Sequence, residues 1–151
     1  MYVCAFIGHS DCPEGVKEKL LLEIENLIVN EKVNTFYVGT QGSFDRLVYE
    51  ALCELEEKYS IESKVTLAYL NRETELTYYN TEKTIFPDCL AKTPPRFAIS
   101  RRNNYMLQKA DYLICFLNHQ FSNTYEFVLK AIKKNIKIIN LGNLSINHIV
   151  V

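Results

Sequence analysis

Short apolar segments rich in β-branched and aromatic residues alternate along this chain with longer segments in which apolar residues recur every three or four positions. The short segments are typical of buried β-strands and the longer ones of amphipathic helices, because the two structures place side chains on one face at different spacings. A Gly or Asn residue follows each short segment. They predict five strands, at residues 2–7, 35–38, 64–70, 111–117 and 137–141.

Helices are predicted between these strands. The first has Pro13 near its first turn, and the second begins with Ser43 as its N-cap. Two further helices are predicted at about residues 95–109 and 123–134. The apolar faces of the first two helices consist of Val16, Leu20, Ile24, Leu27 and Ile28, and of Phe44, Leu47, Val48, Ala51, Leu52 and Leu55.

The alternation of strands and helices predicts the fold class. Strands connected through helices are usually parallel and joined by right-handed crossovers, with helices on both faces of the sheet. We therefore expect a Rossmann-like α/β fold with an open, mainly parallel five-stranded sheet, in one domain over residues 1–151. In such sheets ligands bind at the carboxyl ends of the strands, near the point where the strand order reverses. The loops after the strands are therefore candidate site segments.

Residues 71–94 show neither period and are too long for a simple connection. In one interpretation they form a lid or binding loop, and Tyr78 and Tyr79 stack on a base or sugar. In the other, which we favour, these tyrosines cover an edge of the core. The tail at residues 142–151 has no clear assignment. Its apolar part at residues 146–151 either contributes to a contact between copies, consistent with the homo-oligomer that we expect, or packs on its own sheet.

Composition excludes several classes of protein. With 48% hydrophobic and 23% charged residues, the chain is expected to fold, and its length allows a core without disulfides or a metal. The net charge of −1 provides no overall attraction to nucleic acid or to an anionic membrane, so neither partner is expected. Any anion site must therefore be local.

The cysteines and histidines bear on compartment and cofactors. Five widely spaced cysteines, an odd number, indicate free thiols in a reducing compartment. The apolar N-terminus stops at Gly8 without a basic leader, so no signal peptide or membrane span is expected and the protein is predicted to be cytoplasmic. His9, His119 and His148 share no metal-ligand spacing with the cysteines. We expect neither a structural metal nor a cofactor.

The segment at residues 35–45, TFYVGTQGSFD, places two glycines between a strand and a strongly periodic helix. Gly39 and Gly42 have no Cβ, so backbone N–H groups and the helix N-terminus can approach an anionic ligand closely. This pattern predicts a phosphate cradle for a nucleotide-like ligand. A plain strand-to-helix turn explains the same residues, and the segment lacks the Lys-Ser/Thr pair of a P-loop.

Four groups of polar residues follow the predicted strands: residues 8–10, 39–45, 71–72 and 118–126. They are expected to meet at one edge of the sheet. Arg101 and Arg102 lie early in the third helix, and only one of them can easily face that edge. We favour Arg102, whose guanidinium fork can hold a phosphate, over the alternative that both are solvated surface charges.

The sequence resembles the YpsA-like branch of the SLOG superfamily, which also contains the lonely-guy phosphoribohydrolases and DprA. The resemblance covers nearly the whole chain and lies in CAFIGH at residues 4–9, FYVGTQGSFD at 36–45 and PRFAISRRN at 95–103, with Met106 and ADY at 110–112. It implies a Rossmann-like nucleotide-binding fold. The lonely-guy enzymes, which have that fold, cleave the N-glycosidic bond of nucleoside 5′-monophosphates.

The resemblance also implies site residues, with departures. The Arg-Lys pair of the lonely-guy enzymes corresponds to Arg102 and Asn103, which keeps the arginine and loses the lysine. Their Pro-Gly-Gly-x-Gly-Thr-x-x-Glu segment corresponds to residues 118–126, where Glu126 remains and all three glycines are absent. His119 and Gln120 add bulk there, so the phosphate site is expected to be remodelled. Asp45 replaces a further glycine and would repel a phosphate or accept hydrogen bonds from a ribose.

Two functions remain open. One is binding of a nucleotide or nucleotide derivative, such as an ADP-ribose-type molecule, by a sensor or sequestering module. The other is an N-glycosidase in which Glu126 stabilises an oxocarbenium-like sugar or activates water while Arg102 holds the phosphate. Asp11 is expected to cap a helix rather than to act in catalysis. The candidate ligand-binding residues are Gly8, His9, Ser10, Gly39, Thr40, Gln41, Gly42, Ser43, Phe44, Asp45, Arg101, Asn103, Asn118, Ser122 and Asn123, and the candidate catalytic residues are Glu126 and Arg102.

Overall fold

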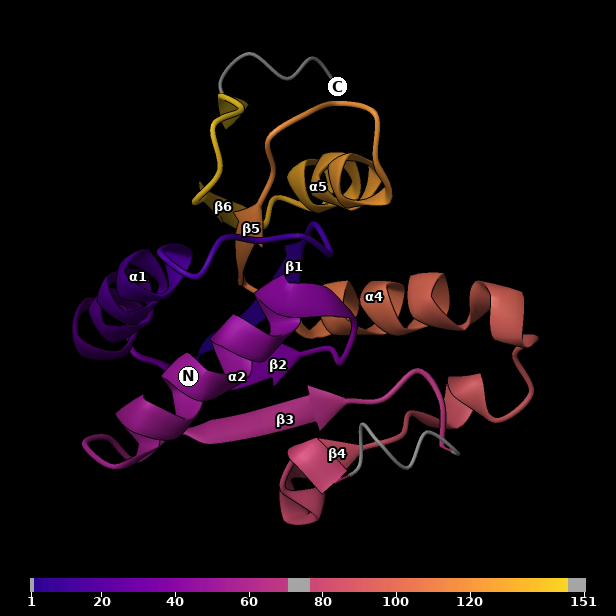
Figure 1. Ribbon diagram of the computed structural model, residues 1–151, viewed down its shortest axis with the longest axis horizontal. Helices are drawn as coiled ribbons and strands as arrows, with labels where there is room; N and C mark the ends of the chain where they lie inside the picture. Colours follow the sequence, from indigo (N-terminus) through magenta and orange to yellow (C-terminus); the bar gives the residue numbers. More distant parts are fainter. Residues whose placement is uncertain (1, 71–76, 147–151) are drawn as a thin grey trace.

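The computed structural model describes residues 2–70 and 77–146, in which six parallel strands form one sheet (Figure 1). The strand order is β4-β3-β2-β1-β5-β6. The prediction of a Rossmann-like α/β fold with parallel strands is thus confirmed, whereas the expected count of five strands is wrong. The strands are β1 (Tyr2–Gly8), β2 (Val33–Val38), β3 (Glu62–Thr66), β4 (Thr84–Ile85), β5 (Tyr112–Phe116) and β6 (Lys137–Asn140).

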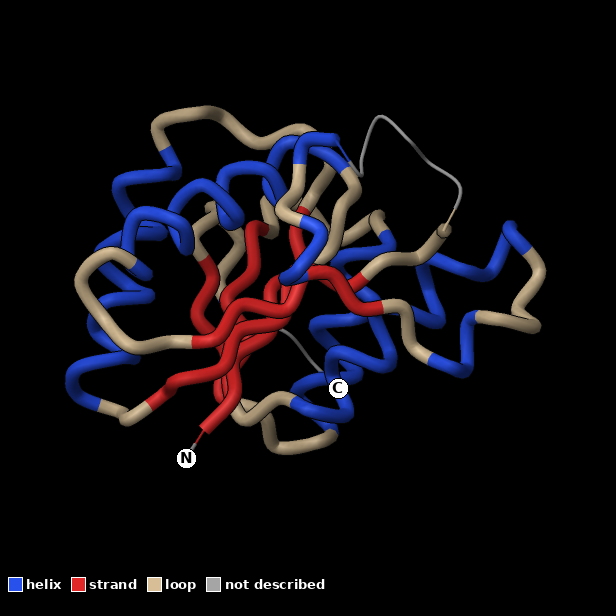
Figure 2. The backbone as a smooth tube through the Cα atoms, turned by 90° about the horizontal axis from the view of Figure 1, so that it is seen from below, coloured by secondary structure: helices blue, strands red, loops and turns tan. Residues whose placement is uncertain are grey.

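Helices cover both faces of the sheet, as Figure 2 shows. The apolar residues of the first two helices pack with one face in a large core cluster, and those of the other two pack with the opposite face in a second cluster. The helices are α1 (Val16–Asn30) and α2 (Gly42–Glu56) on one side, and α4 (Ala98–Lys109) and α5 (Asn123–Lys133) on the other. None of the described helices is long and apolar enough to cross a membrane.

The sixth strand comes from the segment for which the sequence shows no period. β4 has two residues, and it pairs with Val65 and Thr66 at the end of β3. Two residues cannot display an alternation of side chains, so no sequence pattern reveals such a strand. The apolar segment expected at residues 64–70 is a strand only as far as Thr66, although the Leu67 N–H still donates to the Ile85 carbonyl of β4 and Leu67 and Ala68 are buried.

The rest of the irregular segment is compact where it is described. It contains three short 3₁₀ turns, η1 (Thr81–Lys83), η2 (Asp88–Leu90) and η3 (Pro95–Phe97), and the last of these leads into α4. Tyr79 is buried with its ring edge-to-face on Tyr49 of α2, and the hydroxyl of Tyr78 donates to Glu50. Both tyrosines therefore cover the core edge. The expected strand-end residues 71 and 72 lie outside the described residues, as does the end of the tail at 147–151.

Two expected helix caps are wrong. The N-cap of α2 is Gln41, one residue before the helix begins at Gly42, and the Ser43 hydroxyl instead accepts from the Cys12 N–H at 2.6 Å and donates to the Ser10 carbonyl at 2.9 Å. Ser43 therefore ties the loop after β1 to the start of α2. The N-cap of α1 is Gly15, which has no side-chain cap, so Asp11 does not cap that helix.

The strand order places a crevice at the centre of the sheet. From β1 the chain builds β2, β3 and β4 on one side, and then crosses over to build β5 and β6 on the other. β1 pairs with β5 through Gly8 opposite Phe116, so the loops that follow these two strands diverge from adjacent positions. A ligand pocket is expected at such a point of reversal.

Gly42 is the glycine whose backbone the fold requires most strictly. Its φ is +89°, and a Cβ there would lie 2.5 Å from the backbone of Ser10. Gly42→Ala should therefore lower the free energy of unfolding by about 2 to 4 kcal/mol, through left-handed strain and the clash. Gly15→Ala is the matched control, because nothing lies within 4 Å of its added methyl group, and should change stability by no more than about 0.5 kcal/mol. Urea unfolding measures both, and equal midpoints would contradict the argument.

Candidate functional site

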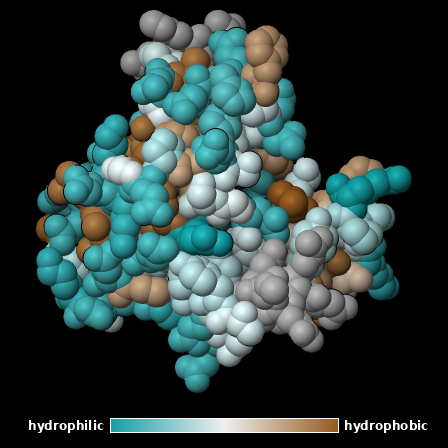
Figure 3. All heavy atoms as spheres, viewed as in Figure 1, coloured by the Kyte–Doolittle hydropathy of each residue, from teal (hydrophilic) through white to brown (hydrophobic). Residues whose placement is uncertain are grey.

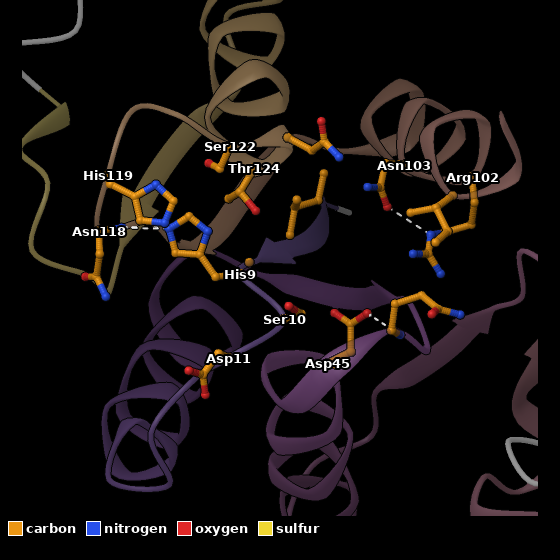
Figure 4. A pocket seen from close by; sticks show the side chains of 16 residues that line it. His9, Ser10, Asp11, Asp45, Arg102, Asn103, Asn118, His119, Ser122 and Thr124 are labelled. Atoms are coloured by element: carbon orange, nitrogen blue, oxygen red, sulfur yellow. Dashed lines mark hydrogen bonds between the residues drawn. The ribbon is translucent and has the colours of Figure 1, made fainter. Parts of the chain in front are cut away.

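A cavity of about 670 Å³ lies at the carboxyl ends of the central strands (Figure 4). Four segments far apart in the sequence line it: the loop after β1, the start of α2, one face of α4, and the loop from β5 into α5. This is the edge at which the strand-end loops are expected to meet. The lining residues are Ile7, Gly8, His9, Ser10, Asp11, Gln41, Gly42, Asp45, Ile99, Arg102, Asn103, Asn118, His119, Ser122, Asn123 and Thr124.

The loop after β1 contributes a histidine with a fixed proton. His9 Nε2 accepts a hydrogen bond from the Asn118 N–H at 3.0 Å, so the neutral ring carries its proton on Nδ1, which faces the cavity in Figure 4. The ring stacks on His119 with centroids 4.2 Å apart. Burial, and then the nearby charge of His119 when protonated, lowers the pKa of His9. His9 is therefore a neutral hydrogen-bond donor at the wall between β1 and β5.

The start of α2 contributes a buried carboxylate. Asp45 is 6% exposed, and one of its oxygens accepts from the Gln41 N–H at 2.9 Å, which satisfies a free donor at the helix N-terminus. Burial raises the pKa of Asp45 to about 6, although the charge of Arg102 and the Gln41 hydrogen bond both oppose that rise. Asp45 is thus ionised at neutral pH but easily protonated below it.

Helix α4 contributes the arginine, which is 2% exposed. The Arg102 Nε donates to the Asn103 side-chain oxygen at 2.9 Å, and Nη1 donates to the Thr66 carbonyl at 3.1 Å. Gly39 packs directly against it, since a Cβ at Gly39 would lie 2.4 Å from the guanidinium. The hydrogen bonds and this contact hold the guanidinium in one position at the cavity wall. Ile99, one turn earlier on the same helix face, adds an apolar surface.

The start of α5 contributes donors. Ser122 is the N-cap, and its hydroxyl accepts from the Tyr125 N–H at 3.1 Å. Within the described residues, the N–H groups of Asn123 and Thr124 have no acceptor. Thr124 is 6% exposed, its hydroxyl has no hydrogen-bond partner among the described residues, and Figure 4 shows it directed into the cavity. Free donors at a helix N-terminus favour an anionic group.

Several residues expected at the site do not line the cavity. Gly39 is covered by Arg102, Phe44 lies under Gly8, and Thr40 is buried behind the loop. Ser43 makes the contacts to Ser10 and Cys12 that join two loops. Arg101 and Glu126 are exposed, because each is out of helical phase with the neighbour that faces the cavity. The residues that do line it are Gly8, His9, Ser10, Gln41, Gly42, Asp45, Arg102, Asn103, Asn118, Ser122 and Asn123.

Five lining residues are not among those that the sequence predicts to bind: Ile7, Asp11, Ile99, His119 and Thr124. Helical phase could have identified two of them. Ile99 precedes Arg102 by three positions and Asn103 by four, and Thr124 lies opposite the exposed Glu126. His119 follows Asn118 in a loop whose conformation no periodicity specifies. Asp11 precedes a helix that begins later than expected.

The cavity is polar but has little net charge. Arg102 is its buried cation, Asp45 on α2 offsets that charge, and Asp11 adds a further carboxylate at the exposed rim. A phosphate would therefore depend on the donors of α5 as well as on Arg102. Among the described residues, no three His, Cys, Asp or Glu side chains are arranged to hold a metal ion.

The buried Asp45 makes the stability of the ligand-free protein depend on pH. Its pKa is about 6 when folded and near 3.8 when unfolded, so the folded state binds more protons between these values and stability falls as pH rises through that window. Asp45→Asn keeps an acceptor for the Gln41 N–H and removes this effect. The variant should gain about 2 to 3 kcal/mol relative to the wild type between pH 4 and pH 7.

Urea unfolding at a series of pH values between these limits checks the expectation. Other carboxylates contribute equally to both proteins, so the difference between the two curves isolates Asp45. Asp11→Asn, at an exposed position of the same cavity, is the matched control for the loss of one carboxylate. A constant difference between wild type and Asp45→Asn at all pH values would contradict the burial of an ionised Asp45.

Comparison with known proteins bears on the fold. No protein-family model matches the chain, and no curated protein matches it at a significant level. The structure is similar to the X-ray structure of DNA processing protein A (DprA) from Streptococcus pneumoniae, with a TM-score of 0.71 over 97% of this chain at 12% sequence identity. The chain spans 52% of the length of that protein. The fold is therefore the Rossmann-like α/β fold found in DprA, as the resemblance to the SLOG superfamily implied.

Proposed function

We propose that the protein binds a nucleotide-derived small molecule in the cavity at the centre of the sheet, as a sensor or sequestering module with little turnover. One observation carries this proposal. Buried polar side chains from α2, α4 and α5 face a single cavity at the point where the strand order reverses. Burying polar groups is costly unless they find partners, so a polar ligand that supplies the partners gains affinity.

The proposed ligand has an anionic end and a polar, uncharged part. The N–H groups of Asn123 and Thr124 with the Thr124 hydroxyl provide donors for a phosphate, and Arg102 adds a fixed positive charge. The His9 Nδ1–H supplies a further donor beside them. An ADP-ribose-type molecule or a nucleoside phosphate has both kinds of group.

Nucleic acid and protein partners receive less support. The S. pneumoniae protein is a DNA processing protein by name, but the likeness to it is in fold alone, and the net charge of −1 supplies no strong attraction for a phosphate backbone. On the face shown in Figure 3, hydrophilic residues predominate and the apolar residues are scattered. Scattered apolar residues are normal for a protein surface and provide no argument for a protein partner there.

The N-glycosidase remains a second candidate because the chain keeps Glu126 and Arg102 in positions that resemble the lonely-guy signatures. A glycosidase carboxylate must reach the anomeric carbon or its attacking water. Glu126 is exposed and does not line the cavity, whereas Arg102 does. The geometry therefore favours binding without cleavage.

Arg102 should anchor the ligand. A thermal-shift screen of nucleotides, cyclic nucleotides and ADP-ribose identifies a binder, and calorimetry then gives its affinity. Arg102→Ala and Arg102→Lys should each weaken binding by about 1.5 to 3 kcal/mol, since the first removes the cation and the second removes the guanidinium fork that Thr66 and Asn103 hold at the cavity wall. Arg101→Ala is the matched control on the exposed side of the same helix and should bind normally. Unchanged affinity in both Arg102 variants would remove Arg102 as an anchor.

Glu126 should have no part in turnover. Purified protein incubated with a panel of nucleoside 5′-monophosphates is expected to release no free base by chromatography, and Glu126→Gln should bind ligand as the wild type does. Base release that disappears in Glu126→Gln would instead establish the glycosidase.

A further inference from the structure

Three polar side chains of the cavity are more than nine-tenths buried and have unused hydrogen-bonding capacity. They are Asp45 and Thr124, each 6% exposed, and Asn103, 8% exposed. Figure 4 shows them facing the cavity from three different elements. Most buried polar atoms in folded proteins have a hydrogen-bond partner. Three buried side chains with unused capacity around one cavity therefore indicate which donors and acceptors a ligand must supply.

The orientation of the Asn103 amide is fixed by its neighbour. Its oxygen accepts from the Arg102 Nε at 2.9 Å, and a guanidinium can only donate, so the oxygen must face Arg102. The amide NH₂ group then faces the cavity, where no described residue accepts from it. Asn103 therefore presents a donor, and an exchange of its oxygen and nitrogen is excluded.

The orientation of Asp45 is fixed in the same way. One oxygen accepts from the Gln41 N–H, and no described residue donates to the other, which faces the cavity in Figure 4. Asp45 is ionised at neutral pH, so this oxygen can only accept. The cavity thus has a fixed acceptor on α2 and a fixed donor on α4.

Only some chemical groups can satisfy both. A phosphate accepts but cannot donate to Asp45 and is repelled by it, whereas an ammonium group donates but cannot accept from Asn103. A hydroxyl does both. Two neighbouring hydroxyls can satisfy both residues and still have an oxygen or a proton left for a further contact. Arg102 meanwhile compensates the negative charge of Asp45.

We propose that Asp45 and Asn103 bind the vicinal diol of a ribose, so that the site selects ribonucleotide derivatives over their 2′-deoxy forms. This inference rests on the proposed function and specifies its ligand class. The phosphate of the same ligand is held by Thr124 and the free N–H groups of α5, on a separate wall of the cavity. The two ends of the ligand are therefore recognised by different elements.

The test compares ligands that differ by a single hydroxyl. Calorimetry measures binding of ribose 5-phosphate and 2-deoxyribose 5-phosphate, of the four ribonucleoside 5′-monophosphates with their 2′-deoxy forms, and of ADP-ribose with 2′-deoxy-ADP-ribose. The sugar phosphates make the comparison independent of the base. Wild type should bind the ribose member of a binding pair about 10 to 100 times more tightly, the range for a lost hydrogen bond to a charged group.

Two variants test whether Asp45 and Asn103 cause the preference for ribose. Asp45→Asn and Asn103→Asp each keep the hydrogen bond to Gln41 or Arg102 but can reverse the polarity of the group that faces the cavity. Each should reduce the ratio of ribose to deoxyribose affinity to about one to three, a loss of most of a hydrogen bond's selectivity. Asp11→Asn makes the same charge change as Asp45→Asn, but at the rim, and should alter both affinities together, leaving their ratio unchanged. Urea unfolding shows that each variant is folded.

The outcomes separate this inference from the proposed function. Equal affinity of wild type for both members of a binding pair overturns the ribose inference and leaves nucleotide binding intact. A preference for ribose that persists in both Asp45→Asn and Asn103→Asp also overturns the ribose inference, because other residues then select the sugar. Absence of binding by every compound to folded wild-type protein overturns the proposed function itself.

Discussion

The site is organised around a guanidinium that is held inside the protein. Arg102 crosses from α4 to the carboxyl end of β3, donates to the Thr66 carbonyl and the Asn103 side chain, and lies against the bare backbone of Gly39. A buried charge is tolerated only when it is compensated and hydrogen-bonded. Asp45 supplies compensation from α2, so one cation connects α4 with α2, with the end of β3 and with the glycine that follows β2.

That constraint gives the cavity its chemical character. Since its cation is offset by a carboxylate, the cavity does not act as a simple positive funnel for any anion. Recognition depends instead on where individual donors and acceptors point, and these directions are fixed by contacts within the protein. For the proposed ligand, a missing or extra hydroxyl should therefore matter more than total charge, because an unsatisfied buried group costs more than a change in surface charge.

Much of the fold could be predicted from the sequence, and the reasons for the failures are physical. Long apolar runs such as that in β1 identify strands, but β4 is too short to show a period. The convergence of the strand-end loops follows from parallel topology. The role of Gly39 does not, because its neighbour Arg102 is distant in the sequence, and a glycine needed for packing has the same local pattern as one needed for a ligand.

Helical phase limited the prediction of individual site residues. Thr124 and Glu126 are two positions apart and so point about 200° apart around α5, which places one in the cavity and the other in solvent. The resemblance to lonely-guy enzymes directed attention to the glutamate. The sequence predicts the start of α5 correctly, at about residue 123, but the folded structure shows how the helix is rotated, and hence which side chain faces inward.

The hydroxyl of Ser43 has a kinetic consequence. By linking the loop after β1 to the first turn of α2 through two hydrogen bonds, it holds Ser10 and Gly42 in place before any ligand arrives. A preorganised wall loses little conformational entropy on complex formation. For the ligand binding proposed above, encounter should then need no slow isomerisation of this half of the pocket, and association should be single-exponential with a rate that grows linearly with ligand concentration.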